Sequence, residues 1–357
     1  MTTSKVIGHL IVGLKIGGTE RMLQKTLPAL NSPHQKHIVY NFMSPGPIGL
    51  ELTKLGVDVY DLDMISPTNF FPGLFKLYRY LISHKVQVLT TYFIYSDLVG
   101  RVIGRLAGIR RIYCFQRGAL LNAWPLRIFD FLTKSLVDKY LFVSQVLKDR
   151  VSGQLHLDPA RVLVIPNGIS DQFKNMTKPQ SQSRLTITNI GIFKPKKGQI
   201  YLLNALPLVE TSKYKINCNF LGAGPLLIQA KETAGSIKTK VKIIFLGEVK
   251  NVFPHLINSD IFVFTSLEEG MSNALLEAMV TKCAIVAHKI PENYELLGGD
   301  ALYADILSPE SLSSAINKLI KDPALRFSLG SRARQRALKK FSLKNTISLL
   351  NNLYSEP

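Results

Sequence analysis

The chain of 357 residues exceeds the size at which one hydrophobic core usually stops growing, so two domains are expected. Apolar residues make up 46% of it and charged residues 19%, without a low-complexity tract, which excludes a disordered or fibrous chain. No run reaches the roughly 18 apolar residues that a membrane-spanning helix needs.

The net charge is strongly basic, because 44 Lys and Arg stand against 25 Asp and Glu, giving +19. Residues 1–185 hold 23 basic and 11 acidic residues, so the excess is concentrated in the first half. Such a field favours phosphates, nucleic acid or an anionic membrane surface. The basic residues are scattered and match no nucleic-acid-binding motif, so nucleic acid is not an expected partner.

The three cysteines, Cys114, Cys218 and Cys283, stand in apolar segments without metal or disulfide spacing, as expected of core residues in a reducing compartment. The apolar stretch 6–14 is short and precedes no small-residue cleavage site, so it predicts a buried strand instead of a signal peptide. A cytoplasmic protein is therefore expected.

Short β-branched runs alternate with helical patterns along most of the chain. Strands are predicted at 5–14, 37–43, 57–64, 86–92, 111–117, 139–144 and 161–168, and again at 185–193, 215–224, 240–248, 260–266 and 283–289. The polar residues 171–185 predict a linker. The fold class expected is α/β, with two doubly wound Rossmann-like domains, 1–170 and 186–341, facing across a central cleft.

The turn after the first predicted strand contains Gly17 and Gly18, followed by Thr19 and Glu20 at a predicted helix start. Paired glycines let the backbone approach a ligand, and a helix N-terminus offers N–H groups to an anion. The alternative is a tight turn in which Thr19 caps the helix. The spacing is not a dinucleotide fingerprint, which argues against a nicotinamide dehydrogenase.

Three lysines, Lys194, Lys196 and Lys197, follow a predicted strand in the segment IGIFKPKKG (190–198). Lysine is a point charge suited to a diphosphate, although a solvated basic loop is the alternative. Two more predicted strands end at glycine, Gly222 and Gly247. Each glycine could bring backbone close to a flat base, or could belong to an ordinary turn.

Two carboxylates, Glu269 and Glu277, stand eight residues apart in EEGMSNALLEAM (268–279). Between them, a turn at 270–273 is predicted to present helix N-terminal amides to an anion. The carboxylates would accept hydrogen bonds from sugar hydroxyls on either side. A nucleotide-sugar has this form: ribose, diphosphate and hexose. The alternative is one exposed loop acid and one helical salt bridge.

A metal ion is not expected. Asp61 and Asp63 imitate a metal-binding Asp-x-Asp, but they end a predicted strand in the first domain, away from the motifs of the second. The seven histidines have no ligand spacing either.

The motifs, in their order along the chain, resemble those of the family-four retaining glycosyltransferases of GT-B fold. This family is also called the glycosyl transferases group 1. The resemblance covers nearly the whole chain, and the Glu269–Glu277 segment is its most specific part. It also includes GGTERML (17–23), FVSQVLKD (142–149), VIPNGI (164–169), IGIFKPKKG and FLGAGPL (220–226). It implies a hexosyltransferase that needs no metal cofactor, retains the sugar's configuration and takes a nucleotide-sugar, with UDP-sugar as the expected donor.

The resemblance also implies roles at matching positions. Glu269 would hold hydroxyls of the hexose, Glu277 would hold the ribose, and Lys197 would neutralise the departing diphosphate. The other donor-binding residues would be Gly17, Gly18, Lys194, Lys196, Gly222, Gly247, Glu248, Gly270, Met271, Ser272 and Asn273. The closing segment 342–357 would pack back on the first domain.

Two positions depart from the family pattern. Ile192 stands where an arginine is usual, and Lys194 or Lys196 could supply its charge. Arg117 stands before Gly118 where a histidine is common; it cannot act as a base, but it could bind an acceptor phosphate or a donor oxygen. With Glu269 and Lys197, Arg117 completes the expected catalytic set. A catalytically silent relative that binds nucleotide-sugar or membrane as a partner module is the alternative.

Residues 69–86 and 124–140 mix aromatic and basic side chains, including the only tryptophan, Trp124. Such segments favour peripheral contact with an anionic membrane, here at the inner face of the cytoplasmic membrane. A saccharide acceptor, lipid-linked, in cell-surface polysaccharide or glycolipid biosynthesis is therefore expected. Two amphipathic helices with aromatic residues in the core are the alternative.

Overall fold

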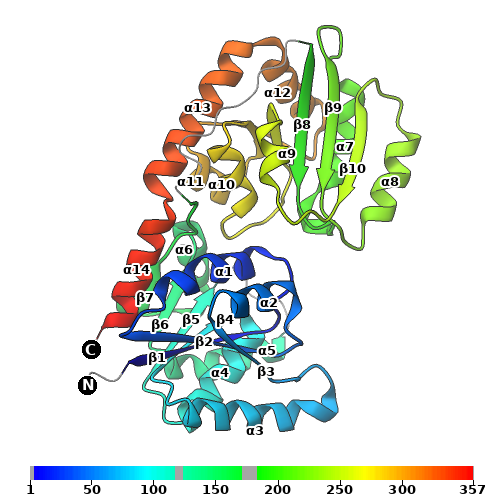
Figure 1. Ribbon diagram of the computed structural model, residues 1–357. Coiled ribbons are helices and arrows are strands. Elements are labelled where there is room, and N and C mark those ends of the chain that lie inside the picture. Colours follow the sequence, from blue (N-terminus) through cyan, green and yellow to red (C-terminus); the bar gives the residue numbers. More distant parts are fainter. Residues whose placement is uncertain (1–3, 117–123, 171–182, 357) are drawn as a thin grey trace. The chain divides into compact units, whose positions relative to one another are not determined.

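The computed structural model describes residues 4–116, 124–170 and 183–356. The chain divides into two compact units (Figure 1). Unit 1 comprises residues 1–167 and 343–357, and unit 2 comprises residues 168–342. Residues 171–182, most of the segment predicted as a linker, lie outside the described residues, and the first strand of unit 2 begins at Arg184.

Unit 1 contains a seven-stranded sheet of order β3-β2-β1-β4-β5-β6-β7, in which every pair of strands is parallel. In the central strands, buried β-branched and aromatic side chains fit a sheet that is covered on both faces. The strands are β1 (Lys5–Ile11), β2 (Gln35–Asn41), β3 (Asp58–Asp61), β4 (Val88–Tyr92), β5 (Arg111–Gln116), β6 (Lys139–Phe142) and β7 (Val162–Val164).

Helices cover both faces of this sheet (Figure 1). Leu77 and Leu81 of α3 share one core with Leu10, Ile38 and Leu89 of the strands. On that face lie α3 (Pro67–Ser83), α4 (Ile94–Leu106) and α5 (Trp124–Thr133); α1 (Gly18–Leu30) and α2 (Gly46–Lys54) lie on the other, and α6 (Gln145–Leu155) connects β6 to β7.

The last helix, α14 (Leu343–Ser355), belongs to unit 1 although it follows unit 2 in the sequence. Its Tyr354 is fully buried, and the Tyr354 hydroxyl lies 3.1 Å from Thr90 Oγ1 on β4. Next to the helix end, Glu356 pairs with Lys139 of β6 at 2.6 Å. These contacts fix the end of the chain against the sheet of unit 1.

Unit 2 contains a six-stranded parallel sheet of order β10-β9-β8-β11-β12-β13. Its strands are β8 (Arg184–Ile190), β9 (Lys215–Leu221), β10 (Lys242–Gly247), β11 (Ile261–Phe264), β12 (Ala284–His288) and β13 (Leu302–Ala304). One face packs on α7 (Gln199–Ala205), α8 (Leu227–Ser236) and α12 (Pro309–Lys321), and the other on α9 (Phe253–Ile257), α10 (Asn273–Val280), α11 (Pro291–Leu297) and α13 (Pro323–Lys340). The expected fold class, two doubly wound α/β sheets, is confirmed.

Each sheet has a point where the strand order reverses. In unit 1, β1 lies between β2 and β4, and in unit 2, β8 lies between β9 and β11. Because right-handed crossovers place the helices after these strands on opposite faces, the loops at their carboxyl ends part and leave room for a ligand. We call the β1/β4 loops the unit 1 switch point and the β8/β11 loops the unit 2 switch point.

Candidate functional site

The predicted lysine loop forms one side of the unit 2 switch point. Residues 191–198 follow β8 and include a short 3-10 turn, Pro195–Lys197. Lys194 and Lys196 are exposed, whereas the Lys197 side chain is 23% exposed. Of the three lysines, Lys197 is therefore the one built into the site.

Hydrogen bonds to backbone carbonyls of the lysine loop join the two loops of this switch point. Thr265, directly after β11, donates from its hydroxyl to the Lys197 carbonyl at 2.8 Å. The Leu267 amide donates to the Lys196 carbonyl, also at 2.8 Å. Gly198 has φ +63°, and a Cβ there would overlap the Thr265 carbonyl oxygen. The close approach of the loops therefore requires glycine at this position.

Asn189 on β8 helps hold the site, and the sequence analysis did not identify it. Its side-chain amide donates to the Val263 carbonyl at 2.8 Å and to the Thr265 hydroxyl at 3.2 Å. The residue is only 3% exposed. A polar amide within a buried strand needs partners, so an asparagine inside the predicted strand 185–193 was the available signal.

The central feature of the site is an ion pair between Lys197 Nζ and Glu269 Oε1. The two residues are 72 positions apart and come from the two loops of the switch point. The Glu269 side chain is 14% exposed. Both charges are thus partly shielded from solvent yet open to a ligand, and a polyanion could compete with Glu269 for the lysine.

Behind Glu269, the chain turns into α10. Ser272 is the N-cap, and its hydroxyl accepts a hydrogen bond from the Leu275 amide at 3.3 Å. Gly270 is buried, and Met271 and Asn273 are partly exposed on either side of Ser272. The helix N-terminus carries a partial positive charge beside the ion pair, which favours an anion there.

Glu277 lies about one turn into α10 and is 6% exposed. It interacts with other groups of the protein. Its role in holding the ribose of a donor remains a prediction.

Glycines stand at the carboxyl ends of the neighbouring strands β8, β9 and β10. The Gly222 amide donates to the Gly247 carbonyl at 2.7 Å, and the Gly191 amide donates to the Leu221 carbonyl at 3.0 Å. Gly222 has φ +140°, where a Cβ would overlap the Gly191 carbonyl oxygen. Exposed Glu248 follows Gly247 at the end of β10. The structure therefore brings the ends of β8, β9 and β10 into one backbone-lined edge.

The remaining predicted residues belong to unit 1. Gly17 is the N-cap of α1 in an extended conformation, with φ −151° and ψ 171°, and Gly18 starts the helix. Thr19 therefore follows the cap and does not form it. Arg117, like Gly118, lies outside the described residues. Roles for these residues remain predictions.

Comparisons with known proteins agree along the chain. Residues 16–173 match the family described as Glycosyltransferase Family 4, and residues 184–322 match Glycosyl transferases group 1. The capsular polysaccharide biosynthesis glycosyltransferase CapH of Staphylococcus aureus is 24% identical over 328 residues, covering 87% of this chain and 90% of CapH. The UDP-Gal:alpha-D-GlcNAc-diphosphoundecaprenol alpha-1,3-galactosyltransferase of Escherichia coli is 23% identical, covering 81% and 80% of the two chains.

The crystal structure of Anabaena Alr3699/HepE in complex with UDP and glucose has the same fold. Its TM-score is 0.84 at 17% identity, and the match covers 98% of this chain and 99% of that one. The two α/β units are thus those of a glycosyltransferase with the GT-B fold. The chain belongs to glycosyltransferase family 4, the glycosyl transferases group 1, and is related to enzymes of capsular and lipid-linked glycan biosynthesis. The resemblance inferred from the sequence is confirmed.

Proposed function

We propose that this protein is a retaining hexosyltransferase that transfers a hexose from a UDP-sugar to a lipid-linked saccharide in cell-surface polysaccharide or glycolipid biosynthesis. The Lys197–Glu269 pair at the unit 2 switch point carries this proposal. A half-shielded lysine beside a helix N-terminus suits a diphosphate, and a neighbouring carboxylate suits sugar hydroxyls. The relatives support the donor and acceptor classes, since the Escherichia coli galactosyltransferase is named for UDP-Gal and a diphosphoundecaprenol-linked sugar.

In this proposal, the donor's diphosphate replaces Glu269 as the partner of Lys197. Glu269, released from the ion pair, accepts hydrogen bonds from hexose hydroxyls, and Glu277 accepts them from the ribose. Gly270, Met271, Ser272 and Asn273 supply backbone contacts to the phosphates at the start of α10. Lys194 and Lys196, both exposed, add positive charge around the entry of the donor. Gly222, Gly247 and Glu248 border the base.

The transfer breaks the bond between the sugar's anomeric carbon and the diphosphate oxygen, and it forms a bond from that carbon to the acceptor's hydroxyl oxygen on the same face. The hydroxyl proton passes to the leaving phosphate oxygen, so UDP departs with the bonding electron pair. Lys197 and the α10 amides stabilise the charge that develops on the leaving group. Because these groups supply fixed positive charge, we expect transfer to continue in excess EDTA.

The membrane contact in this proposal rests on α3 and α5. Phe71 and Phe75 on α3 are 75% and 63% exposed, and Phe131 and Leu132 on α5 are 55% and 67% exposed. Lys134 Nζ lies 4.1 Å from the centre of the Phe131 ring. Exposed aromatic groups beside cations suit the headgroup region of an anionic bilayer.

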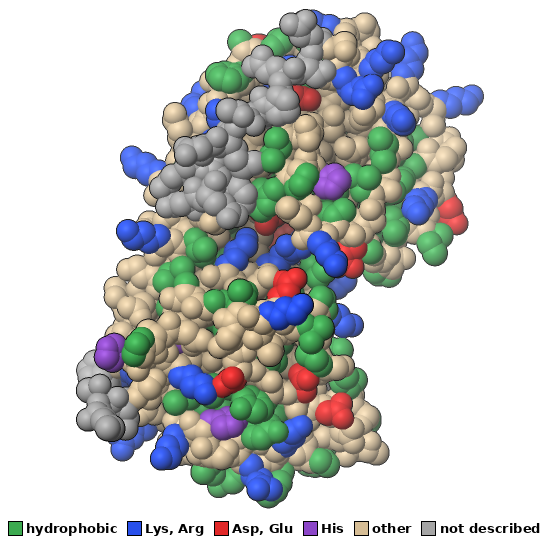
Figure 2. Space-filling model, viewed as in Figure 1, with side chains coloured by type: hydrophobic (Ala, Val, Ile, Leu, Met, Phe, Trp, Pro, Cys, Tyr) green, Lys and Arg blue, Asp and Glu red, His purple; other side chains and the backbone are tan. Residues whose placement is uncertain are grey.

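The charge of these helices points the same way. Helix α3 has no acidic residue, and the only acid of α5, Asp130, is buried against Arg101. Figure 2 likewise shows Lys and Arg side chains spread over the surface in view, with acidic side chains sparser. No helix in the described part of the chain is long and apolar enough to cross a membrane. We therefore propose a cytoplasmic enzyme bound peripherally at the inner face of the cytoplasmic membrane.

Flotation with vesicles tests this contact. Wild-type protein should float with vesicles containing phosphatidylglycerol and dissociate as salt is raised. The double variant Phe71→Ser, Phe75→Ser should float less, whereas Phe327→Ser, which removes a 62% exposed ring from unit 2, should behave as wild type. Equal flotation of all three proteins, or none of the wild type, would exclude α3 as the membrane-binding element.

One observation favours the alternative of a catalytically silent binding module. Ile192, where the family pattern has an arginine, is a 41% exposed apolar side chain at the unit 2 switch point. It can contribute no charge to a leaving group. A silent module would bind nucleotide-sugar at Lys197 without releasing UDP.

Two measurements decide between these functions. A thermal-shift screen against UDP, GDP, ADP, TDP and their common sugars, without divalent metal, should show stabilisation by the uridine series, because binding to the native state raises Tm. The Glu277→Ala variant should lose this effect. Release of UDP from the stabilising UDP-sugar, alone or with membrane extract, then identifies an active transferase, and binding without release identifies the silent module.

A further inference from the structure

The turn between β4 and α4, at the unit 1 switch point, has an unusual backbone. Phe93, directly after β4, has φ 73° and ψ 151°. This region of backbone space is adopted almost only by glycine, because a side chain collides with the main chain. A bulky aromatic residue there persists only where the surrounding structure holds it, and such positions concentrate at functional sites.

Hydrogen bonds on the α4 side hold this turn. The Ser96 hydroxyl donates to the carbonyls of Tyr92 and Phe93, the latter at 2.9 Å. The Asp97 amide donates to the Phe93 carbonyl, also at 2.9 Å. Ser96 and Asp97 are fully buried. These hydrogen bonds therefore hold the backbone of the turn on its buried side.

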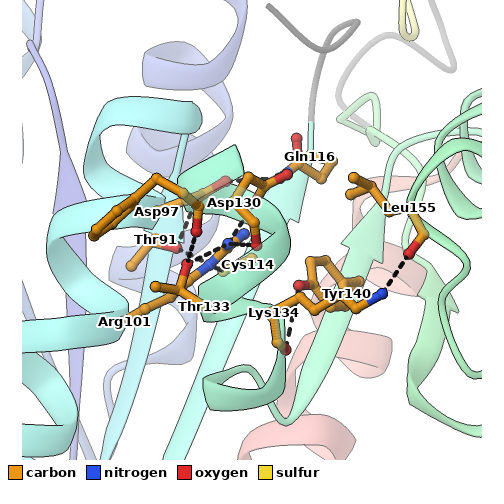
Figure 3. Close-up of polar contacts among 11 residues, drawn as sticks. Thr91, Asp97, Arg101, Cys114, Gln116, Asp130, Thr133, Lys134, Tyr140 and Leu155 are labelled. Atoms are coloured by element: carbon orange, nitrogen blue, oxygen red, sulfur yellow. Dashed lines mark hydrogen bonds and ion pairs between the residues drawn. The ribbon is translucent and has the colours of Figure 1, made fainter. Parts of the chain in front are cut away.

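The Asp97 carboxylate extends this support to the neighbouring strand (Figure 3). It accepts hydrogen bonds from the Thr91 hydroxyl at 2.5 Å and from the Gln116 side-chain amide at 2.6 Å. Gln116 is the last residue of β5 and is 5% exposed. One buried carboxylate thus joins the carboxyl ends of β4 and β5.

A buried ion pair lies close to Asp97. Arg101, one turn later on α4, is fully buried and pairs with Asp130 of α5 (Figure 3). Burial raises the pKa of Asp97 to about 6, an effect that the Arg101 charge opposes. These groups have no exposed face of their own, so their consequence is the rigidity of the turn above them.

Two aromatic side chains at this turn are exposed to solvent. Phe93 is 37% exposed, and Tyr95, in the first turn of α4, is 54% exposed. Tyr92, the last residue of β4, pairs in register with Ile11, the last residue of β1. Phe93 and Tyr95 therefore follow β4 at the carboxyl edge of the sheet, where sheets of this type bind their ligands. This edge also carries polar groups, including the Tyr95 hydroxyl.

We propose that Phe93 and Tyr95 form a platform that stacks on a pyranose ring of the acceptor. A pyranose has an apolar C–H face and a polar rim, which suits aromatic faces in a polar setting. A lipid chain would favour a wider apolar surface, such as the exposed aromatic side chains of α3. The platform rests on the proposed transferase function, because it is the acceptor that supplies the sugar.

The stability of two variants tests the strain. Phe93→Gly and Phe93→Ala both remove the ring, but only alanine keeps a Cβ in the strained conformation. The glycine variant should therefore melt at a higher temperature than the alanine variant, the reverse of the usual order. A lower Tm for Phe93→Gly than for Phe93→Ala would show that the turn is not strained and would overturn the argument.

Ligand contact tests the platform itself. Saturation-transfer difference NMR, with UDP present to occupy the donor site, is measured with methyl α-pyranosides of glucose, galactose, GlcNAc and GalNAc, and with octyl β-glucopyranoside. At least one pyranoside should show signal on its ring protons. Phe93→Gly, Phe93→Ala and Tyr95→Ala should lose that signal, while Phe71→Ala should keep it.

Three outcomes would overturn the platform: no pyranoside contact, contact that survives Phe93→Gly, or contact only through the octyl chain. The last would identify a lipid-binding edge instead. The UDP thermal shift is read in the same samples. If UDP fails to stabilise the protein while the ring signal depends on Phe93, the transferase proposal fails and the sugar platform stands.

Discussion

The two switch points share one topology and differ in chemistry. In unit 2, the loops after β8 and β11 bring together a lysine and a carboxylate at the start of a helix. In unit 1, the turn after β4 presents Phe93 and Tyr95 and keeps its charges, Asp97 and Arg101, fully buried beneath the surface. The strand order therefore creates the place for a ligand, and the side chains on the loops decide which ligand chemistry it suits.

The ion pairs of the two switch points differ in how far they are exposed to solvent. Lys197 and Glu269 are partly exposed, and we propose that a ligand replaces one partner of this pair. Arg101 and Asp130 are almost fully enclosed, so breaking their pair would leave an uncompensated buried charge. The charged pair at the unit 2 switch point is partly open to solvent, whereas the buried charges beneath the unit 1 turn support its shape. Experiments on both units test this contrast between the two switch points.

Lys197→Met should reduce the rate of sugar transfer by roughly 10²–10³-fold, because it removes a positive group aimed at the leaving diphosphate. The rate is measured as UDP release at saturating donor. Lys231→Met is the control, since it removes an exposed lysine of α8 outside the unit 2 switch point. Equal losses in both variants would indicate a general effect of basic charge and not a specific role for Lys197.

Acidification should destabilise unit 1 through a buried histidine pair. His9 Nε2 lies 2.8 Å from His37 Nδ1, and burial lowers the pKa of both rings, that of His37 to about 4. The neutral rings are favoured in the folded state, so stability is full above the unfolded pKa of 6.5 and is lost as pH falls towards 4. His37 alone should account for a loss on the order of 3 kcal/mol.

His37→Gln isolates this effect, because Asp97, with its raised pKa, works in the opposite direction in both proteins. Urea unfolding at pH 7 and pH 4.5, with hydrogen exchange of the β1 and β2 amides, should show a weaker pH dependence in the variant. His34→Gln, at an exposed position of the same unit, is the control. An unchanged pH dependence in His37→Gln would remove the histidine pair as the cause.

Glu277→Gln should weaken UDP binding by roughly 10- to 100-fold, because a hydrogen bond to a charged group contributes about 1.5–3 kcal/mol. Isothermal titration calorimetry with UDP gives the Kd directly. Phe93→Gly should leave the Kd for UDP unchanged, because we place donor binding at the unit 2 switch point and not at the unit 1 turn. A comparable loss in Phe93→Gly would mean that the unit 1 turn also serves the donor.

Gly222→Ala should destabilise unit 2 by about 1–3 kcal/mol, since φ +140° is strained for alanine and its Cβ would meet the Gly191 carbonyl. Gly235→Ala, on α8 with open space around it, should instead stabilise the protein by about 0.5–1 kcal/mol. Thermal unfolding of both variants measures the difference. The same sign of change in both would show that the strand-end glycine is not conformationally required.

Much of the candidate site of unit 2 could be predicted from local sequence. The alternation of strands and helices predicted both sheets, and Glu269, Glu277 and the lysines were assigned to loop and helix starts where the structure has them. These features are encoded within a few residues, by apolar period, glycine and helix start signals. The Phe93 turn was missed because no local pattern predicts a glycine-like conformation for phenylalanine.

Local sequence patterns predict where most strands and helices occur, and hence the fold class and the family. Only the tertiary structure decided which distant residues meet. Lys197 and Glu269 are 72 residues apart, His9 and His37 are 28 apart, and Asp97 reaches Gln116 on the next strand. The physical reason is that these pairs depend on strand order and register, which are settled by packing of the whole sheet and not by the neighbours of each residue along the chain.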